Sequence, residues 1–287
     1  DIITINKNKS KIIVIGDLHA DFKKTINMLI YFGIIDKNKK WIGGEIIIVQ
    51  LGDQIDGKGR GGNDNAEGEL KMLEFFDNLH LQAQKFGGAV YSLLGNHEIM
   101  NTVGRFDYVS NQDIQDFGGF EDRLHLFKPS KENDKGCIAK KFACTRKVFL
   151  KINDILFVHA GVVPELVREH KSNTIKIIND LMRKYLNGDI DSNDSQIKKY
   201  FSNSNSVLWD RSLGKDIVNC EDVDEILKEL NAKHIVIGHT PQSIINQKCN
   251  NKVWRVDVGL SKSLGNNTFQ VLEITKNKNS YNFKILN

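Results

Sequence analysis

Five short polar motifs in the sequence combine aspartate, asparagine and histidine, and each comes directly after an apolar run. They read Gly16-Asp17-Leu18-His19, Gly52-Asp53-Gln54-Ile55-Asp56, Gly95-Asn96-His97-Glu98, Val158-His159-Ala160-Gly161 and Gly238-His239-Thr240. The glycine in each motif allows a sharp turn and a close approach of the backbone to a bound group. One Gly-Asp or Gly-His pair carries little information, but five such motifs in this order indicate a shared site.

The side chains of these motifs offer oxygen and nitrogen ligands and no sulfur. This set suits divalent metals of borderline hardness, and we expect two such ions, with Mn in use and Fe, Zn, Ni or Co fitting the same ligands. One carboxylate can bridge two cations, and a water between them becomes hydroxide near neutral pH. A histidine beside a leaving group can then act as general acid. The chemistry predicted from the residues alone is metal-assisted hydrolysis.

Regular elements are needed to bring these motifs together. Short Ile/Val runs at 11–15, 45–51 and 89–94 alternate with helical patterns at 22–32 and around Leu70 to Leu79. This βαβαβ order predicts parallel strands joined by right-handed crossovers. Because ligands of open α/β sheets bind beyond the carboxyl ends of the strands, the motifs are expected to meet there.

The second half of the chain predicts another group of strands. Residues 146–151 and 154–158 indicate a hairpin around Asn153, and helices are expected at 164–186 and 195–201. Strands are expected at 234–237, 252–258, 268–274 and 281–286. We expect these last four to form a second sheet packed on the first. One domain spanning 1–287 is predicted, with insertions at about 100–145 and 165–230.

Composition excludes several classes of protein. The chain has 287 residues, 40% hydrophobic and 26% charged, and a net charge of +4, as in a globular protein. Disordered chains carry fewer apolar residues and more net charge. A nucleic-acid partner is not expected, because the 40 Lys and Arg against 36 Asp and Glu show no clustering on a predicted face. No run of about 18 uncharged apolar residues predicts a transmembrane segment.

Cysteine usage and the first residue bear on the compartment. The four cysteines, Cys137, Cys144, Cys220 and Cys249, contain no Cys-x-x-Cys pair, so free thiols are expected, with a Cys137–Cys144 bridge as the alternative in an oxidising compartment. The chain begins at Asp1 without Met or a signal peptide, and we expect a trimmed N-terminus. The secretory pathway, a vesicle lumen and the cytoplasm all stay open, as does the oligomeric state.

From about residue 11 to 261, the order of the motifs resembles the calcineurin-like metallophosphoesterases, and within them the phosphoprotein phosphatases. The segments GNHEIMN (95–101), Tyr108-Val109 and VDVGLS (256–261) resemble the bacterial-like Shewanella-type branch, or Shelphs, known from bacteria, plants and apicomplexan parasites. The loops rich in Asn and Lys fit a parasite homologue. The resemblance implies an α/β fold, an αββα sandwich of two mixed sheets flanked by helices.

Carried over by motif, the resemblance also implies roles for single residues. Asp17 and His19 are implied as ligands of the first metal, and Asp53 as the bridge between both metals. The implied ligands of the second metal are Asn96, His159 and His239. His97 is implied as the general acid, oriented by Asp56. The alternative role for Asp56 is to cap a turn. Asn101 is a candidate for the residue that stops the helix after GNHEIM.

One segment departs from the family pattern. The protein phosphatases read Asp-x-x-Asp-Arg-Gly, whereas here Asp56 is followed by Gly57-Lys58-Gly59-Arg60. Either Arg60 folds back to hold phosphate or Lys58 replaces the missing arginine, and Arg60 is favoured because a guanidinium binds phosphate through two parallel hydrogen bonds. Arg211, after Leu208-Trp209-Asp210, is a second candidate.

The predicted function is that of a metal-dependent protein phosphatase whose partner is a phosphorylated protein or peptide. The resemblance implies a preference for phosphotyrosine over phosphoserine and phosphothreonine, and a deeper, narrower site made by the two insertions would favour the longer side chain. Two alternatives remain at this point. One is hydrolysis of bis-nucleoside polyphosphates or phosphodiesters on the same fold, and the other is a metal-free binding scaffold.

Overall fold

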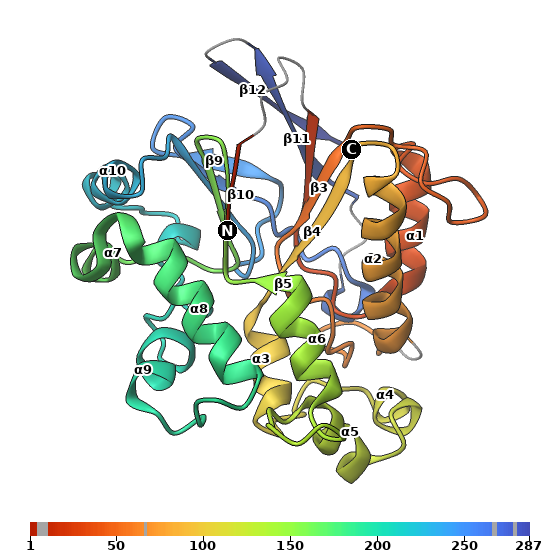
Figure 1. Ribbon diagram of the computed structural model, residues 1–287. Helices are drawn as coiled ribbons and strands as arrows, with labels where there is room; N and C mark the ends of the chain where they lie inside the picture. Colours follow the sequence, from red (N-terminus) through yellow and green to blue (C-terminus); the bar gives the residue numbers. More distant parts are fainter. Residues whose placement is uncertain (5–10, 66–67, 266–268, 278–279) are drawn as a thin grey trace.

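The computed structural model describes residues 1–4, 11–65, 68–265, 269–277 and 280–287. Its first sheet grows from the three expected parallel strands, β2 (Lys11–Ile15), β3 (Ile47–Gln50) and β4 (Ala89–Leu93). The crossovers are α1 (Phe22–Tyr31) and α2 (Glu69–Gln84), which lie side by side on one face of the sheet (Figure 1). At the far edge, β5 (Arg146–Lys147) continues the parallel order beside β4.

The second sheet has the strand order β1-β6-β7-β8-β10-β9. Its strands are β1 (Ile2–Ile3), β6 (Phe149–Ile152), β7 (Ile155–Val158), β8 (His234–Ile237), β9 (Asn246–Lys248) and β10 (Val253–Arg255). The expected hairpin is confirmed, since β6 and β7 pair in antiparallel fashion across a turn at Asn153, whose φ is 51°. Parallel pairing of β7 with β8 places two further motifs at the same edge.

The expectation that the last two strands join the second sheet is wrong. The hairpin of β11 (Val271–Asn277) and β12 (Ser280–Leu286) extends the first sheet, because β11 pairs antiparallel with β2. Alternating apolar residues predict a strand but not its neighbour, and here Leu272 and Ile274 lie opposite Val14 and Ile12. The start expected at residue 268 lies outside the described residues.

The two segments predicted as insertions contain most of the remaining helices. The first carries the end of α3 (Asn96–Thr102), α4 (Asn111–Asp116), α5 (Phe120–Phe127) and α6 (Cys137–Thr145). The second carries most of α7 (Pro164–His170), then α8 (Thr174–Leu186), α9 (Ser195–Ile197), a π-helical turn (Lys198–Ser202) and α10 (Cys220–Glu229). The single helix expected at 164–186 is interrupted, because Lys171 has a φ of 50° and a 3₁₀ turn over Lys171–Asn173 redirects the chain.

Helix α3 also corrects one expectation. Asn101 does not stop the helix, which continues to Thr102. Short 3₁₀ turns at Ser212–Gly214 and Lys262–Leu264 complete the regular structure of the described residues.

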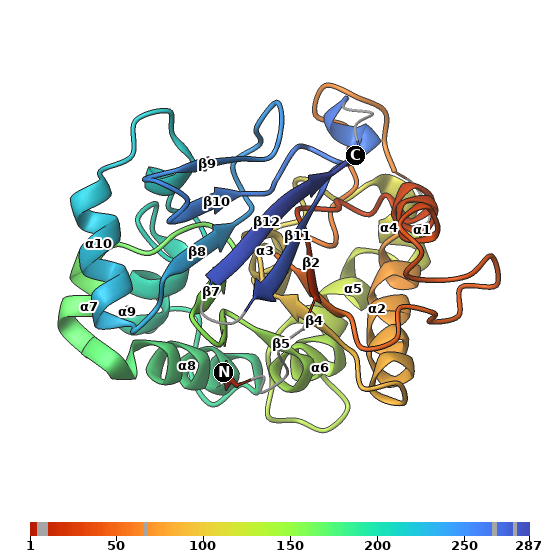
Figure 2. The same ribbon diagram turned by 90° about the horizontal axis from the view of Figure 1, so that it is seen from above.

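Buried side chains form the layers of an αββα sandwich, which confirms the expected fold class. Successive residues of β2 point to opposite faces, so Ile12 and Val14 enter the core between the sheets while Ile13 and Ile15 contact the layer of α1 and α2. Another core lies between the second sheet and the helices of the insertions, with Phe149 and Val158 on the sheet side. Figure 2 shows the two sheets between their helical layers.

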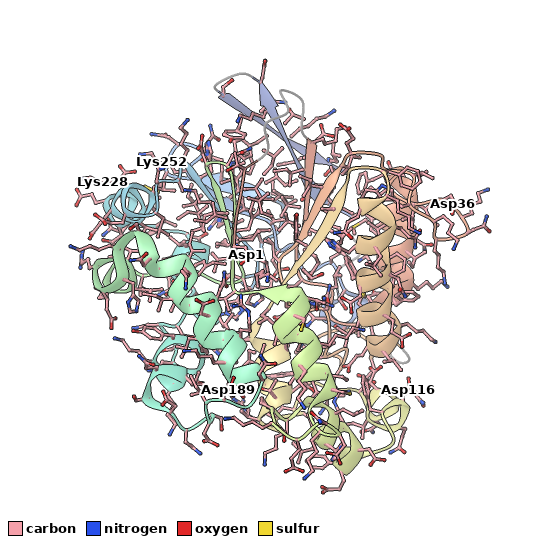
Figure 3. All side chains as sticks on the ribbon, viewed as in Figure 1. Asp1, Asp36, Asp116, Asp189, Lys228 and Lys252 are labelled. Atoms are coloured by element: carbon pink, nitrogen blue, oxygen red, sulfur yellow. A yellow bond between two sulfur atoms is a disulfide. The ribbon has the colours of Figure 1, made fainter. Side chains whose placement is uncertain are left out.

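A disulfide bond joins Cys220 at the start of α10 to Cys249 after β9. Free thiols were expected at all four cysteines, and this holds for Cys137 and Cys144 but is wrong for this pair. The two cysteines are 29 residues apart in the sequence, so their spacing did not predict the bond. The bond joins α10 to the β9–β10 hairpin. Lys252 of the same hairpin pairs with Asp224 of α10, and Figure 3 labels Lys252 in this part of the molecule.

A helix that spans a membrane must be long and almost wholly apolar. None of the described helices is both long and apolar enough to cross a bilayer.

Candidate metal centre

All five motifs meet at the carboxyl ends of the central strands, where the two sheets face each other. Asp17 follows β2, Asp53 follows β3, Asn96 begins α3 after β4, and His159 and His239 follow β7 and β8. Contacts between motifs cross the sheet boundary, since the backbone N–H of His239 donates to both carboxylate oxygens of Asp17 at 3.2 and 3.1 Å. The centre therefore takes residues from both sheets.

Two groups of buried side chains have the spacing of a metal site. His19, Asp53 and His97 form one group, and Asp53, His159 and His239 form the other, with ligand atoms in each group within 4.8 Å of one another. Asp53 belongs to both. Nε2 of His239 is buried without a hydrogen-bond partner, as expected of an imidazole that is waiting for a ligand. This donor set of carboxylate and imidazole fits a pair of divalent cations that share Asp53.

Two other predicted ligands lie against these groups. Oδ1 of Asn96 is 3.0 Å from Nε2 of His159, and that Nε2 is 3.4 Å from Oδ2 of Asp53. Asp17 is 2% exposed and reaches within 4.0 Å of Nδ1 of His159. The structure thus brings all six predicted ligands into one buried cluster.

Hydrogen bonds to the backbone select the ring nitrogen that faces the cluster. Nδ1 of His159 lies 2.8 Å from the carbonyl of Leu51, and Nδ1 of His19 lies 3.3 Å from the carbonyl of Ile55. A carbonyl only accepts, so Nδ1 carries a proton in both rings, and Nε2 is the nitrogen that faces the cluster. Outer hydrogen bonds of this kind are typical of histidines that bind metals.

Unusual backbone angles turn the side chains inward. The φ angles of His19, Asp53, Asp56 and His239 are 41°, 51°, 69° and 64°, in the left-handed region that side chains other than glycine rarely adopt. Such strain persists only where surrounding contacts enforce it, and it is concentrated at functional sites. Gly95 is needed for a related reason, because a Cβ there would lie 2.1 Å from Oδ1 of Asp53.

Burial and neighbouring charges tune the imidazoles. Burial and the nearby His159 lower the pKa of His239 to about 3, and burial together with His97 and Arg60 holds the pKa of His19 well below its ordinary value. Both rings are therefore neutral at pH 7 and able to donate a lone pair. Burial also acts on His159, but Asp53 and Asp17 outweigh it and raise the pKa of His159 to about 10.

His97 makes a close pair with Asp56. Its Nδ1 donates to Oδ2 of Asp56 at 2.6 Å, and its Nε2 lies 3.8 Å from Oδ2 of Asp53, at the edge of the cluster. Burial lowers the pKa of His97, but the carboxylates of Asp53 and Asp56 outweigh it and leave the pKa above its ordinary value. A protonated Nε2 at this position can give a proton to a group bound beside the cluster.

The three predicted phosphate-binding residues lie in different places. Nη1 of Arg60 donates to Nε2 of His97 at 3.2 Å, and the Nε and Nη2 atoms of Arg60 are buried without hydrogen-bond partners. Lys58 is exposed and donates to the carbonyl of Asp107. Arg211 is exposed beside the metal cluster, and its Nη1 donates to the backbone carbonyl of His239 at 3.1 Å.

Sequence reasoning gave no role to two residues that complete the centre. Glu98 accepts hydrogen bonds from the backbone N–H groups of Asp53, Gln54 and Gly95 at 3.0, 2.8 and 2.7 Å, and so holds the Asp53 turn in place. Tyr108 lies 5.0 Å from the ring of His97 and 4.9 Å from the guanidinium of Arg60. The acidic residue in the first turn of α3 was a usable signal for Glu98, whereas Tyr108 was noted only within the Tyr108-Val109 segment of the resemblance, without a role at the site.

Comparison with known proteins gives this geometry a family. Residues 10–243 match the family model described as calcineurin-like phosphoesterase. Shewanella-like protein phosphatase 2 of Arabidopsis thaliana is 29% identical over 313 residues, which covers 93% of this chain and 75% of the plant protein. Shewanella-like protein phosphatase 1 of Plasmodium berghei is 29% identical over 266 residues, which covers 89% of this chain and 68% of its own.

A solved structure of a cold-active protein tyrosine phosphatase is also similar. It matches with a TM-score of 0.75 and 26% identity, over 99% of this chain and 80% of that one. The family model covers most of the chain and includes all five motifs. The chain therefore belongs to the calcineurin-like phosphoesterase family, is a metallophosphoesterase hydrolase by that membership, and has Shewanella-like protein phosphatases among its relatives.

Proposed function

We propose that the protein is a metal-dependent protein phosphatase that hydrolyses phosphomonoesters, with phosphotyrosine preferred over phosphoserine and phosphothreonine. The observation that carries the proposal is the position of Asp53 in both ligand groups, with the His97–Asp56 pair beside it. Asp17 and His19 would hold one ion with Asp53, and Asn96, His159 and His239 would hold the other. When bound, the ion pair activates water as the nucleophile and stabilises charge on the phosphoryl group.

The chain's own groups supply the remaining chemistry. Arg60 has two unpartnered nitrogens beside His97, and a phosphate monoester offers acceptors for both. His97 protonates the leaving oxygen once Arg60 turns from Nε2 to the substrate phosphate and Nε2 carries a proton, and Asp56 holds the ring and stabilises its cationic form. Lys58 is not assigned to phosphate, because its amine is exposed and bonded to Asp107. Arg211 would contact substrate from beside the metal cluster.

Aromatic side chains on both sides of the centre support a preference for phosphotyrosine. Tyr108 comes from the first insertion and lies beside His97, while Trp209 comes from the second and lies 6.1 Å from the ring of His239. Such walls suit a long aromatic substrate side chain, and a tyrosine phosphatase is among the similar structures. We expect Mn in use, while Fe, Zn, Ni and Co fit the same ligands.

A substrate panel tests the proposal. The purified chain, supplied with Mn, is offered a phosphotyrosine peptide, a phosphoserine peptide, a dinucleoside polyphosphate and a phosphodiester. We expect kcat/KM to be highest for the phosphotyrosine peptide, and we expect His97→Asn to lower kcat by roughly 10²- to 10⁴-fold. Preferential cleavage of the polyphosphate or diester would replace the proposal with that activity. A chain that binds no metal and cleaves nothing would be a scaffold.

A further inference from the structure

A chain of buried hydrogen bonds continues behind Asp56, away from the metal ligands. While Oδ2 of Asp56 accepts from His97, Oδ1 accepts from Nδ2 of Asn101 at 2.8 Å. The same amide nitrogen also donates to the backbone carbonyl of His97 at 2.9 Å. Asn101 therefore contacts both members of the His97–Asp56 pair, and it is completely buried.

Arg123 of α5 fixes the direction in which the Asn101 amide points. Its Nε and Nη2 both donate to Oδ1 of Asn101, at 2.9 and 2.7 Å. A guanidinium has no acceptor, so the amide oxygen must face Arg123 and the amide nitrogen must face Asp56. Arg123 thereby makes Asn101 a donor to the carboxylate.

Glu69 of α2 links Arg123 to the backbone of Asp56. Nη2 of Arg123 is 2.6 Å from Oε2 of Glu69, and Oε1 of Glu69 accepts from the backbone N–H of Asp56 at 2.8 Å. This backbone is in the left-handed region, with a φ of 69°. The side chain and the strained backbone of Asp56 are thus both held by groups that Arg123 orients.

The surroundings of Arg123 indicate that its charge is kept for these contacts. The side chain is fully buried, and its guanidinium lies 5.2, 4.7 and 4.8 Å from the rings of Phe106, Phe117 and Phe127. Burying a charge costs free energy unless it is well paired, and an apolar residue would pack there at lower cost. The first insertion therefore carries a charged group to a point directly behind the catalytic pair.

We propose that Asn101 and Arg123 are positioning residues for proton transfer, which hold Asp56 so that His97 presents its proton to the leaving oxygen. The inference rests on the proposed function, because it takes His97 as the general acid. The leaving group provides a direct readout. A good leaving group departs without protonation, whereas an alkyl oxygen requires it, so misplacing His97 slows alkyl phosphates more than activated aryl phosphates.

The experiment uses the Mn-loaded enzyme with a phosphoserine peptide and 2,4-dinitrophenyl phosphate. We expect Asn101→Ala to lower kcat on the peptide at least ~10-fold more than on the aryl phosphate, in the same direction as His97→Asn. The matched control is Asn179→Ala. Asn179 is buried on α8 and accepts from the backbone of Val148 and Phe149 at 3.0 Å, far from the pair in the sequence. It should lower the melting temperature without changing the ratio of the two rates.

A double-mutant cycle shows whether Asn101 acts through Asp56. In the Asp56→Asn background, adding Asn101→Ala should change the rate ratio less than about 2-fold, because the contact it supports is already altered. If Asn101→Ala does not fold, Arg123→Lys is used in its place. This substitution keeps a positive charge beside Glu69 but removes the two parallel hydrogen bonds to Oδ1 of Asn101. It should produce the same pattern.

Two results would overturn the inference. An unchanged rate ratio in a folded variant, or fully additive effects in the cycle, would make the network a structural feature only, while wild type and His97→Asn would still support the proposed function. If wild type cleaves neither substrate, or His97→Asn does not change the ratio, the general-acid assignment fails and the inference fails with it.

Discussion

Asp56 has three contacts that leave little freedom for its carboxylate. Its two oxygens accept from His97 and Asn101, and its backbone N–H donates to Glu69. Because both carboxylate oxygens already accept hydrogen bonds, Asp56 is not placed to contact a substrate directly. Its effect on catalysis must therefore pass through the proton affinity and orientation of His97.

This gives a prediction for the pH profile. Burial lowers the pKa of His97, while Asp53 and Asp56 raise it above its ordinary value, so a general acid here remains protonated below that raised pKa and loses activity as the pH rises through it. Asp56→Asn removes one raising charge. The alkaline limb of kcat for the phosphoserine peptide should then move to lower pH. Asp77→Asn, whose carboxylate pairs with Arg146, should leave the limb in place.

Arg60 and Lys58 form a natural pair for comparison. We expect Arg60→Ala to lower kcat/KM by roughly 10- to 100-fold and to weaken inhibition by inorganic phosphate, since hydrogen bonds to charged groups contribute about 1.5–3 kcal/mol. Lys58→Ala should change both values little, because its amine contacts Asp107. Equal effects of the two substitutions in steady-state assays would contradict the assignment of Arg60.

The sequence predicted the residues that follow the strands better than those that support them. Asp17, His159 and His239 are marked by an apolar run and a neighbouring glycine, which is a local signal. Arg123 has no such signal, because its partners Asn101 and Glu69 come from other helices. Interactions that form only after helices pack leave no trace in local spacing.

At the scale of elements, the junction between α10 and the β9–β10 hairpin has a covalent link. The Cys220–Cys249 bond spans 29 residues that include β8 and the His239 turn. Closing a loop in the unfolded chain reduces its entropy, so the bond favours the folded state by an amount that grows with loop length.

Removing this link should reduce stability. The double variant Cys220→Ser/Cys249→Ser is expected to lose roughly 3–4 kcal/mol in the free energy of unfolding, measured by urea denaturation. Cys137→Ser/Cys144→Ser should match wild type, because both thiols are free and exposed. A reductant should lower the stability of wild type and leave the Cys220→Ser/Cys249→Ser variant unchanged. Equal stability of all three proteins would contradict the bond.

The bounds of the helices were harder to predict from the sequence than the bounds of the central strands. The strands β2, β3 and β4 lie where their apolar runs predict them. The helix expected at 164–186 has a continuous apolar pattern, yet the chain turns at Lys171 so that α7 can pack against α10 and α8 against α6. That turn depends on tertiary contacts rather than on a glycine or proline.

At the scale of the whole molecule, the metal centre lies across the two sheets. Asp17, Asp53 and Asn96 follow strands of the first sheet, whereas His159 and His239 follow strands of the second. Ions bound by both sets connect the layers. Metal binding should therefore favour the folded state as a whole.

Thermal unfolding with and without chelator measures this coupling. At a metal concentration 100 times the Kd, the folded state should gain about 2.7 kcal/mol, which raises the melting temperature by roughly 4–5 °C for a chain of 287 residues. His239→Ala should lose most of that increment. His80→Ala, which removes a side chain of α2 that accepts from the backbone of Val90, should keep it. An increment unchanged by His239→Ala would place the ions elsewhere.

The layered architecture could be predicted, but not the membership of each sheet. Alternating βα units imply a parallel sheet with helices outside, and the additional strands imply a second sheet. The β11–β12 hairpin carries the same alternation whichever sheet it joins. Its place beside β2 depends on which edge is left open once the parallel strands have formed.

That place beside β2 has a consequence for synthesis. The strand leading into Asp17 is made early, but its second neighbour, β11, leaves the ribosome only after every other ligand-bearing motif has been translated. Until then one edge of β2 stays uncovered and able to pair with a foreign strand. The nascent chain is therefore expected to be most prone to mispairing between the synthesis of β2 and that of β11, and to complete its first sheet only when the hairpin has emerged.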